Sequence, residues 1–305
     1  MKGKVLIAGG SGLVGTRLAE CLIEEGYDVI ILSRSKQGKK GKVNYAKWNP
    51  AEQLIDEDAL SANHVINLAG AGIADRPWTK NRRKELRDSR LISTNFLLKK
   101  FAEYDKKLKT YLGASAIGYY GDGGDNWQSE DQAPAYQSFM TDLCKDWEAA
   151  HHDFSTCSDR VSIVRIGIVL STLGGAYPKM RLPFKVGVGS YFGSGDQYYS
   201  WIHIEDLAMM FIHLIETNKG HGIFNGVSPI PLTNKELIVA IKNALDISGL
   251  IISAPSITLK LTMGQMSNVI LNSNRVSSKK IEQTEFNFRF GEIENAVKDI
   301  EQRSI

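Results

Sequence analysis

The sequence contains few cysteines, little net charge and no long apolar run. Its 305 residues include three cysteines, an odd number without metal-ligand spacing, which argues against a disulfide framework and a cysteine-bound metal. We therefore expect a reduced, cytoplasmic protein with no metal site. No uncharged apolar run approaches the roughly 18 residues that indicate a membrane-spanning helix, so we expect no membrane span.

The near balance of charge limits the class of partner. The 37 basic and 34 acidic residues leave a net charge of +3, which is too small to indicate a nucleic-acid partner. Residues 34–42 carry five basic residues and no acidic one, and residues 80–90 carry six basic and two acidic residues. Such runs are typical of solvated faces. With 43% hydrophobic residues, the chain can bury the core of an ordinary globular protein.

The glycines that are present mark one stretch near the amino terminus. Residues 5–8 are apolar without alternation, which is typical of a buried parallel strand, and an amphipathic helix follows. In the turn between them, Gly9 permits a tight bend, Gly12 lets the backbone approach a pyrophosphate, and Gly15 lets the helix pack on the strand. The candidate cofactor-binding residues of this stretch are Gly9, Ser11, Gly12, Leu13, Val14 and Gly15.

The surroundings of this turn favour a dinucleotide site over a purely structural loop. The turn follows a strand, opens a helix whose free N–H groups face an anion, and precedes a second strand at residues 29–32. A Walker-type phosphate loop is excluded because Thr16 follows Gly15, at the position where that loop needs a lysine.

The alternation of strand and helix patterns predicts an α/β fold with a Rossmann-like doubly wound parallel sheet. Further strands are expected near residues 64–68, 110–114, 161–165 and 201–204, and helices near 80–104, 139–150 and 206–216. We place an NADP-binding domain at residues 1–170, to which residues 200–226 return, and a smaller mixed substrate lobe and C-terminal domain at residues 171–305. Ligands of such sheets bind beyond the carboxyl ends of the strands.

Three further expectations concern two segments of the chain and the start of one helix. Residues 33–49 are polar and are expected to connect two strands. Residues 174–200 are rich in glycine and aromatic residues and are expected to be irregular. Asp206 is placed to cap the helix that ends near Glu216.

Several short segments resemble one protein family. They are Asn67-Leu68-Ala69-Gly70, Ser115-Ala116-Ile117-Gly118-Tyr119-Tyr120-Gly121, and residues 143–148, 165–170, 193–197 and 201–206. Together with the glycine-rich turn, they resemble extended short-chain dehydrogenases/reductases, and more narrowly the atypical NAD(P)-dependent epimerase-family proteins with their own short C-terminal domain. The resemblance runs essentially from end to end. It implies a Rossmann-like fold and NADP(H) binding, with a small-molecule substrate that is an unknown carbonyl compound or sugar-nucleotide-like molecule.

The residues after the second strand favour NADP(H) over NAD(H). An NAD-binding protein presents Asp or Glu to the ribose hydroxyls there, whereas this chain has Ser33 and Arg34. A carboxylate would repel a 2′-phosphate and Arg34 would pair with it; the alternative is a basic surface loop. The resemblance adds Leu68, Ala69, Gly70, Glu85, Arg90 and the backbone around Ile168 as cofactor neighbours.

The expected catalytic pair is missing. Ordinary members of the family use a tyrosine with a lysine four residues on, because the ammonium group lowers a phenol pKa that is otherwise about 10. No tyrosine here has a lysine at that spacing. Ser115 remains to hold a substrate carbonyl, and Tyr119 or Tyr120 to supply a hydroxyl, although both tyrosines also suit a packing role. His203, which titrates near pH 6.5 when unperturbed, is a further candidate with a structural alternative.

Two functions therefore remain open. The first is an NADP(H)-dependent oxidoreductase or epimerase with a rearranged acid and base, and the second is an NADP(H)-binding sensor or regulatory protein without turnover. The substrate lobe favours the first, and the missing pair favours the second. For an enzyme, we expect Ser115 and the two tyrosines to meet Trp201 and His203 at the nicotinamide. The sequence leaves the oligomeric state open.

Overall fold

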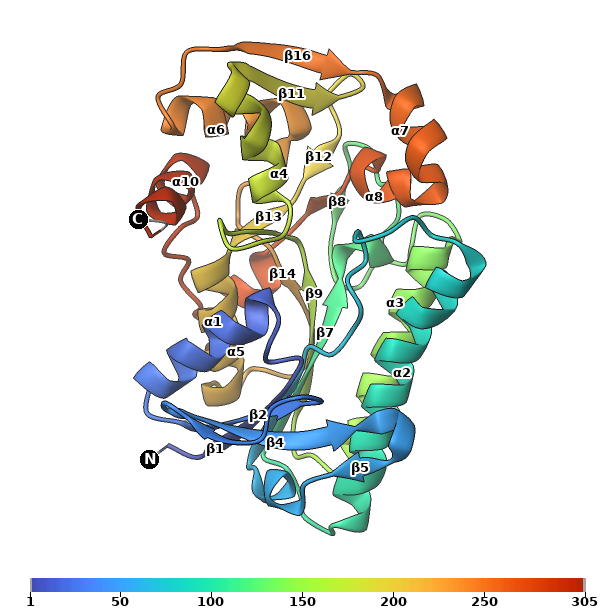
Figure 1. Cartoon of the computed structure of the whole chain (residues 1–305), viewed down its shortest axis with the longest axis vertical. Coiled ribbons are helices and arrows are strands. Elements are labelled where there is room, and N and C mark those ends of the chain that lie inside the picture. The colour runs from blue at the N-terminus through green and yellow to red at the C-terminus, as the bar shows by residue number, and fades with distance from the viewer. Residues whose placement is uncertain (1, 304–305) are drawn as a thin grey trace.

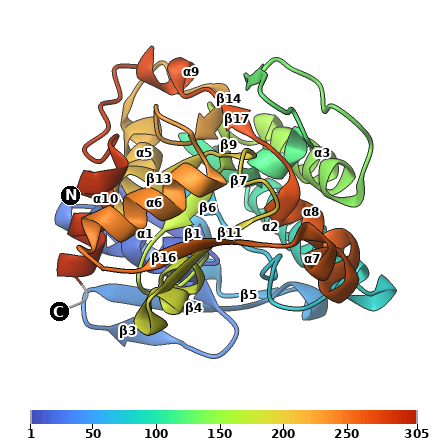
Figure 2. The same ribbon diagram turned by 90° about the horizontal axis from the view of Figure 1, so that it is seen from above.

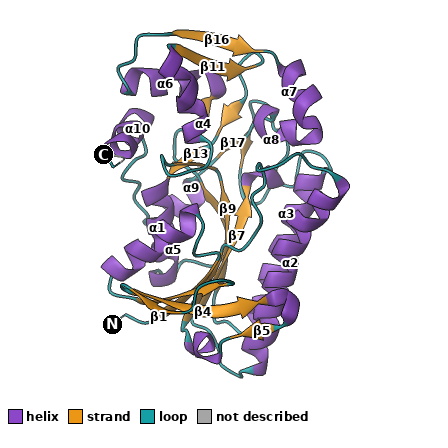
Figure 3. Cartoon of the chain, in the orientation of Figure 1, coloured by secondary structure: helices purple, strands orange, loops and turns teal. Residues whose placement is uncertain are grey.

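A computed structural model describes residues 2–303 and shows a mostly parallel central sheet between two helical layers (Figures 1 and 3). The strand order is β14-β9-β7-β6-β1-β2-β4-β3, with β5 paired to β4. Only the pairs β3–β4 and β4–β5 of this described sheet are antiparallel. The strands are Lys4–Ala8 (β1), Asp28–Ser33 (β2), Gly38–Lys40 (β3), Val43–Asn49 (β4), Leu54–Ile55 (β5), His64–Asn67 (β6), Thr110–Ala116 (β7), Val161–Ile166 (β9) and Gly222–Gly226 (β14). The predicted α/β fold with a Rossmann-like sheet is confirmed.

The two faces of the sheet are covered by different helices (Figure 1). One face carries α1 (Leu13–Glu24) and α5 (Ile204–Glu216), and the other carries α2 (Lys80–Glu103) and α3 (Phe139–His152). The chain runs outward from β1 to β2 and β4, then returns to β6 on the other side of β1. This reversal opens a crevice beyond the carboxyl ends of β1 and β6, where ligands of doubly wound sheets bind.

Strand β1 shows why its apolar residues do not alternate with polar ones. Val5 and Ile7 belong to the core beneath α1 and α5, whereas Leu6 and Ala8 belong to the core beneath α2. All four side chains are fully buried, and burying each of the three larger ones typically stabilises a protein by about 1.5–3 kcal/mol. A strand in the middle of a sheet that is covered on both faces is stabilised by an unbroken apolar run.

The residues that follow β9, apart from α5 and β14, form a smaller region across the carboxyl edge of the sheet, at the top of Figure 1 and nearest the viewer in Figure 2. Its core includes Leu170, Trp201, Leu237, Phe290 and Val297. The strand pairs outside the main sheet are Trp127–Gln128 (β8) with Arg275–Val276 (β17), Ile168–Leu170 (β10) with Trp201–His203 (β13), Val188–Phe192 (β11) with Leu250–Ala254 (β16), and Tyr198–Tyr199 (β12) with Leu232–Thr233 (β15). The remaining helices are Tyr177–Arg181 (α4), Asn234–Ala244 (α6), Ser256–Met263 (α7), Asn268–Leu271 (α8), Lys279–Glu282 (α9) and Ile293–Gln302 (α10).

This region also reaches α2 and α3. Met266 lies in the short 3-10 turn Gly264–Ser267 and packs in one apolar cluster with Trp78, Leu86 and Leu143. The contact brings the segment that leads into α8 beside the helices on the far side of the crevice.

Two segments that were expected to lack regular structure contain strands. Within residues 33–49, β4 pairs in parallel with β2 and buries Ala46 and Trp48. Within residues 174–200, a proline in the first turn of α4 favours a short helix, and β11 pairs with β16 about sixty residues further on. Each of these strands is stabilised by pairing with other strands, and for β11 the partner is far along the sequence, so the composition of the segment itself does not predict them.

The expectation that Asp206 caps α5 is wrong. His203 is the N-cap residue, and its side chain accepts a hydrogen bond from the backbone N–H of Glu205. Asp206 lies inside the first turn and is buried, and its carboxylate accepts the backbone N–H groups of Arg289 and Phe290, each at 2.9 Å. Asp206 therefore holds the segment before α10 against α5. Burial raises its pKa despite these hydrogen bonds.

Over residues 2–303, no helix is long and apolar enough to cross a membrane. In the same part of the chain, no group of three or more His, Cys, Asp or Glu side chains is placed to hold a metal ion.

Candidate cofactor and substrate site

The three fingerprint glycines differ in what the fold requires of them. Gly9 has a φ of +77°, and a Cβ there would lie 2.7 Å from the backbone of Leu68. A Cβ at Gly15 would lie 2.6 Å from Gly10 Cα. A Cβ at Gly12 would meet only the Gly9 carbonyl oxygen, at 3.4 Å. The fold therefore requires Gly9 and Gly15, whereas at Gly12 it leaves open space beside the backbone.

The start of α1 can receive an anion. Gly12 is the N-cap residue of this twelve-residue helix, and no side chain caps it. The first turn of α1 contains no acidic residue. The N–H groups of such a turn are unsatisfied within the helix and carry partial positive charge. Ser11 is exposed at the tip of the turn.

On one side of this turn lies a cavity of about 640 Å³, here called the Arg34 cavity. Its lining includes the predicted cofactor residues Arg34, Ala69, Gly70 and Glu85. No hydrogen bond or ion pair within residues 2–303 engages the Arg34 guanidinium. Glu85 is exposed and its charge is compensated: the hydrogen bond from Arg82 and the charges of Arg82 and Arg76 lower its pKa.

Ser33 stabilises the turn that contains Arg34. Its side-chain oxygen accepts hydrogen bonds from the backbone N–H groups of Ser35 at 3.3 Å and Lys36 at 3.0 Å. The hydroxyl therefore holds the turn that leaves β2, while the Arg34 side chain stays exposed. The predicted role of Ser33 as a cofactor contact remains a prediction.

On the other side of the turn lies a cavity of about 280 Å³, here called the Ser115 cavity. The predicted residues that it brings together are Gly12, Leu13, Val14, Leu68, Arg90 and Ser115. Arg90 is buried, its guanidinium lies 4.8 Å from the ring centre of Trp147, and its Nη1 donates to the Leu86 carbonyl at 2.9 Å. Burial lowers the Arg90 pKa to about 10.

Ser115 belongs to a buried ionic network that the sequence analysis did not find. Its hydroxyl donates to Glu148 Oε1 at 2.7 Å. The Glu148 carboxylate is paired on both oxygens with Arg165, with Nε–Oε1 and Nη2–Oε2 distances of 2.9 Å. An ionised carboxylate only accepts hydrogen bonds, so the Ser115 proton points at Glu148 and the serine oxygen presents its lone pairs elsewhere.

Met140 and Cys144 occupy the spacing of the missing tyrosine and lysine. They lie four residues apart on α3, and both line the Ser115 cavity. Burial raises the pKa of the Cys144 thiol to about 12. The thiol is therefore protonated near neutral pH and is not a ready base.

The two tyrosines after β7 contact Arg165 and are absent from the linings of the Ser115 cavity and its neighbours. Tyr120 is fully buried; its hydroxyl donates to Asn225 Oδ1 at 2.7 Å and accepts from Arg165 Nη1 at 3.0 Å. Burial raises its pKa to about 12. The ring centre of Tyr119 lies 3.5 Å from the Arg165 guanidinium carbon. In this conformation both tyrosines hold the guanidinium that orients Glu148.

The structure does not bring His203 to Ser115. His203 is fully buried between α5 and α10, with Nε2 3.3 Å from Asp299 Oδ2 and its ring 4.0 Å from that of Phe290. It lines a different cavity, behind α1. Burial lowers its pKa to about 4. Trp201 is also fully buried, in the core of the smaller region. The expected meeting of Ser115 with these two residues is not found, because β13 pairs with β10 and turns both side chains into that core.

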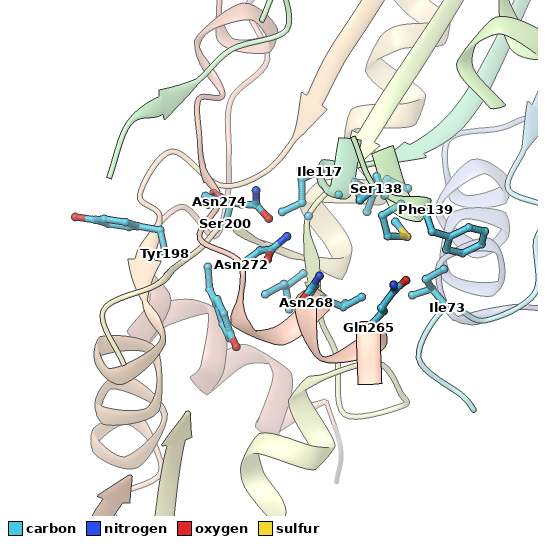
Figure 4. Close-up of a pocket in the computed structure, with 18 of the residues that line it drawn as sticks. Ile73, Ile117, Ser138, Phe139, Tyr198, Ser200, Gln265, Asn268, Asn272 and Asn274 are labelled. Carbon is cyan, nitrogen blue, oxygen red and sulfur yellow. The ribbon is translucent and has the colours of Figure 1, made fainter. Parts of the chain in front are cut away.

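A third cavity, of about 190 Å³, adjoins the Ser115 cavity (Figure 4). We call it the amide cavity after the amide side chains in its lining, which are Gln265, Asn268, Asn272 and Asn274. Ile168 lines it as well. Both cavities share the lining residues Ile73, Ala116, Met140 and Ile166. At its other end, the Ser115 cavity is lined by Leu68 and Arg90, which directly adjoin Ala69 and Ser89 in the lining of the Arg34 cavity.

Sequence reasoning missed the amide cavity. Gln265, Asn268 and Asn272 lie three and four residues apart, which is a helical spacing that places side chains on one face. This pattern was the available signal. The opposite wall comes from residues around 73, 117 and 139, and no local pattern connects it to the amides.

Taken together, the glycine-rich turn at a helix start, the crevice at the strand reversal and the helices on both faces define a Rossmann-like nucleotide-binding protein. The chain belongs to the NAD dependent epimerase/dehydratase family, which residues 5–225 match. Residues 254–300 match a domain of unknown function, DUF1731. The predicted membership among epimerase-family proteins with their own C-terminal domain is confirmed.

Relatives are similar over nearly their whole length. The epimerase family protein SSP1921 of Staphylococcus saprophyticus is 32% identical over 303 residues, covering 97% of this chain and 98% of the relative. The crystal structure of human epimerase family protein SDR39U1 with NADPH has a TM-score of 0.85 and 30% identity, covering 98% and 99% of the two chains. The nucleoside-diphosphate sugar epimerase of Corynebacterium glutamicum has a TM-score of 0.76 and 28% identity, covering 97% of this chain and 57% of that one.

Proposed function

We propose that the protein is an NADP(H)-dependent oxidoreductase or epimerase that acts on a small molecule without the usual tyrosine and lysine. One observation carries the proposal: the Ser115 cavity lies at the unsatisfied N-terminus of α1, shares part of its lining with the amide cavity, and is lined by direct chain neighbours of residues that line the Arg34 cavity. On this proposal, residues 1–170 with 200–226 hold the cofactor, and residues 171–305 supply the substrate end. We further propose a cytoplasmic location.

The residues fit NADP(H) at three points. The space beside Gly12 and the N–H groups of α1 suit a pyrophosphate. Arg34 is exposed and unpaired within the described chain, and it lines the cavity at the end of β2 where a 2′-phosphate would lie. The Ser115 cavity adjoins the same turn on its other side and suits the nicotinamide. The human relative named above, SDR39U1, was crystallised with NADPH, which supports the choice of nucleotide.

Ser115 and Glu148 offer a path for the substrate proton. The bound nicotinamide supplies or accepts the hydride. As the carbinol carbon of a substrate loses its hydride, the hydroxyl on that carbon can donate its proton to the Ser115 oxygen, while the serine proton passes to Glu148 Oε1 across a hydrogen bond of 2.7 Å. Arg165 holds the carboxylate on both oxygens and so fixes the direction of this path. Cys144 is not the base of this path, because burial raises the pKa of its thiol to about 12 and keeps it protonated near neutral pH.

A second candidate function is an NADP(H)-binding sensor without turnover. It is favoured by Met140 and Cys144, which are at the spacing of the tyrosine and lysine and cannot replace their acid and base.

Turnover by purified protein tests the proposal. The protein is incubated with NADPH and a panel of ketones, aldehydes and sugar derivatives, with absorbance recording reduction and product analysis recording redox-neutral epimerisation. Ser115→Ala should lower turnover at least about tenfold while NADPH affinity is retained, the pattern of lost transition-state stabilisation. Ser162→Ala, which removes another buried serine hydroxyl but on β9 and outside the three cavities, is the matched control and should retain turnover. Equal turnover in Ser115→Ala and wild type would contradict the assigned site, and NADPH binding without turnover on a broad panel would favour the sensor.

A further inference from the structure

The lining of the amide cavity contains no charged side chain. Its twenty lining residues include no Asp, Glu, Lys, Arg or His. A diphosphate buried there would bring two negative charges without a partner, and an unpaired buried charge costs several kcal/mol. Sites that take up phosphates supply arginine or lysine for this reason.

The amide side chains have unused hydrogen-bonding atoms of both kinds. Asn274 Nδ2 donates to the Gly121 carbonyl, which fixes the orientation of that amide and leaves Oδ1 without a protein donor. Gln265 Oε1 accepts from Arg83 Nη2 at 2.7 Å, and because an arginine only donates, Gln265 Nε2 is the unused atom. Asn272 Nδ2 donates to the Tyr136 hydroxyl at 2.9 Å, which leaves Oδ1.

Asn268 leaves the most hydrogen-bonding capacity. Neither polar atom of its side chain has a hydrogen-bond partner anywhere in residues 2–303. Figure 4 shows Gln265, Asn268 and Asn272 extending from one segment toward the side where Ile117, Ser138 and Phe139 lie. Hydroxyl groups both donate and accept, so they match such a mixture of amide oxygens and N–H groups.

The opposite wall is mainly apolar, with Ser138 as its hydroxyl group. Trp78 and Phe139 meet edge to face with ring centres 5.1 Å apart, and the single polar atom of the Trp78 ring donates to the Ile73 carbonyl at 2.8 Å. Met140 and Ile117 continue this wall. An aromatic wall facing a row of amides suits a ring that has hydroxyls on its edge and C–H groups on one face.

The size of the amide cavity also favours a small ligand. Its volume of about 190 Å³ is below the roughly 300–1,000 Å³ of pockets for drug-sized ligands, and a nucleoside diphosphate is already the size of such a ligand before a sugar is attached. We propose that the amide cavity binds an uncharged, hydroxyl-bearing ring compound, such as an unphosphorylated sugar or a hydroxylated cyclic ketone, and not a sugar nucleotide. The proposal rests on the proposed function, since it names the substrate class for the same site.

One cation, Arg83, lies close enough to the amide cavity to reveal a negatively charged ligand. Arg83 is half-buried, hydrogen bonds to Gln265, and has its guanidinium 5.5 Å from the ring centre of Phe139. It is outside the cavity lining. A ligand with a phosphate would recruit Arg83, whereas an uncharged ligand would not depend on its charge.

The experiment uses protein saturated with NADP⁺ and a set of uncharged hydroxylated rings, each paired with its phosphate ester and, for sugars, its UDP derivative. Saturation-transfer NMR detects binding, and titration gives the affinities. The variants are Asn268→Leu, Asn272→Leu and, as the charge control, Arg83→Gln, which keeps a donor for Gln265. At least one uncharged ring should bind at least about tenfold more tightly than its phosphate ester. Its binding should fall at least about tenfold in both asparagine variants and stay within about twofold in Arg83→Gln.

Two results would overturn the proposal. The first is that phosphorylated or UDP-linked compounds bind more tightly than the uncharged rings and lose this binding in Arg83→Gln. The second is that no uncharged ring shows binding that is weakened by the Asn268 and Asn272 substitutions. NADP⁺ affinity is measured for every variant. Retained NADP⁺ binding assigns either result to the substrate class, whereas a wild-type protein that does not bind NADP⁺ would contradict the proposed function instead.

Discussion

The two ends of the crevice differ in charge. The Arg34 cavity is lined by Arg34, Lys84, Glu85 and Asp88, and within residues 2–303 only Arg34 of these four has no partner of opposite charge. The amide cavity has no charged lining residue at all. The first end suits an anionic ligand that remains partly in solvent, and the second suits an uncharged one. The family name alone does not predict an uncharged end, because a sugar-nucleotide substrate would be anionic.

The Ser115 cavity lies between the two ends, and the charged side chains beside it are paired with each other. Arg165 and Glu148 are paired and buried, and their charges do not face a ligand directly. Such a pair stabilises little by itself, but removing one partner leaves an uncompensated buried charge. The pair therefore acts on the site through the orientation of Ser115.

The largest expected effect is on stability, from Arg165→Met. The substitution leaves the Glu148 carboxylate buried without its cation, which costs about 3–5 kcal/mol of the free energy of unfolding. Urea denaturation of variant and wild type measures the difference. Arg87→Met, which removes the exposed pair between Arg87 of α2 and Asp146 of α3, is the matched control and should cost less than about 1 kcal/mol. Equal losses in the two variants would show that the buried pair is not a distinct feature of the site.

The next largest effect is on cofactor binding, from Gly12→Val. A Cβ at Gly12 meets no backbone closer than 3.4 Å, so the fold should persist, whereas the side chain would occupy the space proposed for the pyrophosphate. NADPH affinity should fall by at least about a hundredfold with an unchanged circular dichroism spectrum. Gly9→Val is the contrasting variant, because its φ of +77° should make it destabilise the fold itself. Normal NADPH binding by Gly12→Val would place the cofactor elsewhere.

The sequence predicted the parts of this molecule whose signals are local. Strand β1, the glycine-rich turn and α1 follow one another within about twenty residues, and a doubly buried strand has an unbroken apolar run. The predicted roles of Gly9 and Gly15 also agree with the conformation and close contacts of the turn. The crevice followed from the strand order, since a reversal places it beyond β1 and β6.

The rest depends on contacts between distant residues. Glu148 and Arg165 lie on different elements, and nothing in their spacing indicates that they share Ser115 as a neighbour. The amide cavity joins side chains from residue 73 to residue 274. His203 ends strand β13, at the carboxyl end where a cleft residue is expected, but the pairing of β13 with β10 directs it toward Asp299 and Phe290. Local patterns give the elements, and these side chains acquire their partners only when the elements pack.

A smaller effect distinguishes the two nucleotides. NADPH should bind at least about tenfold more tightly than NADH, as expected for one charge-assisted contact to the 2′-phosphate, and Arg34→Ala should remove most of this preference while leaving NADH affinity unchanged. Calorimetric titration with both nucleotides gives the four constants. Lys39→Ala, which removes a nearby exposed cation outside the cavity lining, should keep the preference. Equal wild-type affinities for the two nucleotides would contradict the proposed role of Arg34.

The smallest effect on the crevice is expected from His203, because it lies outside the row of cavities. His203→Asn keeps a side-chain acceptor at the N-cap of α5 and should change NADPH affinity by less than about twofold. It should instead alter the pH dependence of stability. The folded-state pKa of His203 is lowered by burial to about 4, whereas an unfolded histidine titrates near 6.5. Between these values the unfolded chain binds the extra proton, so the contribution of His203 is present above pH 6.5 and is lost as pH falls toward 4. Urea denaturation across this range should therefore show a shallower decline in the variant than in wild type. A loss of turnover in His203→Asn with unchanged pH dependence would instead make His203 part of the catalytic site.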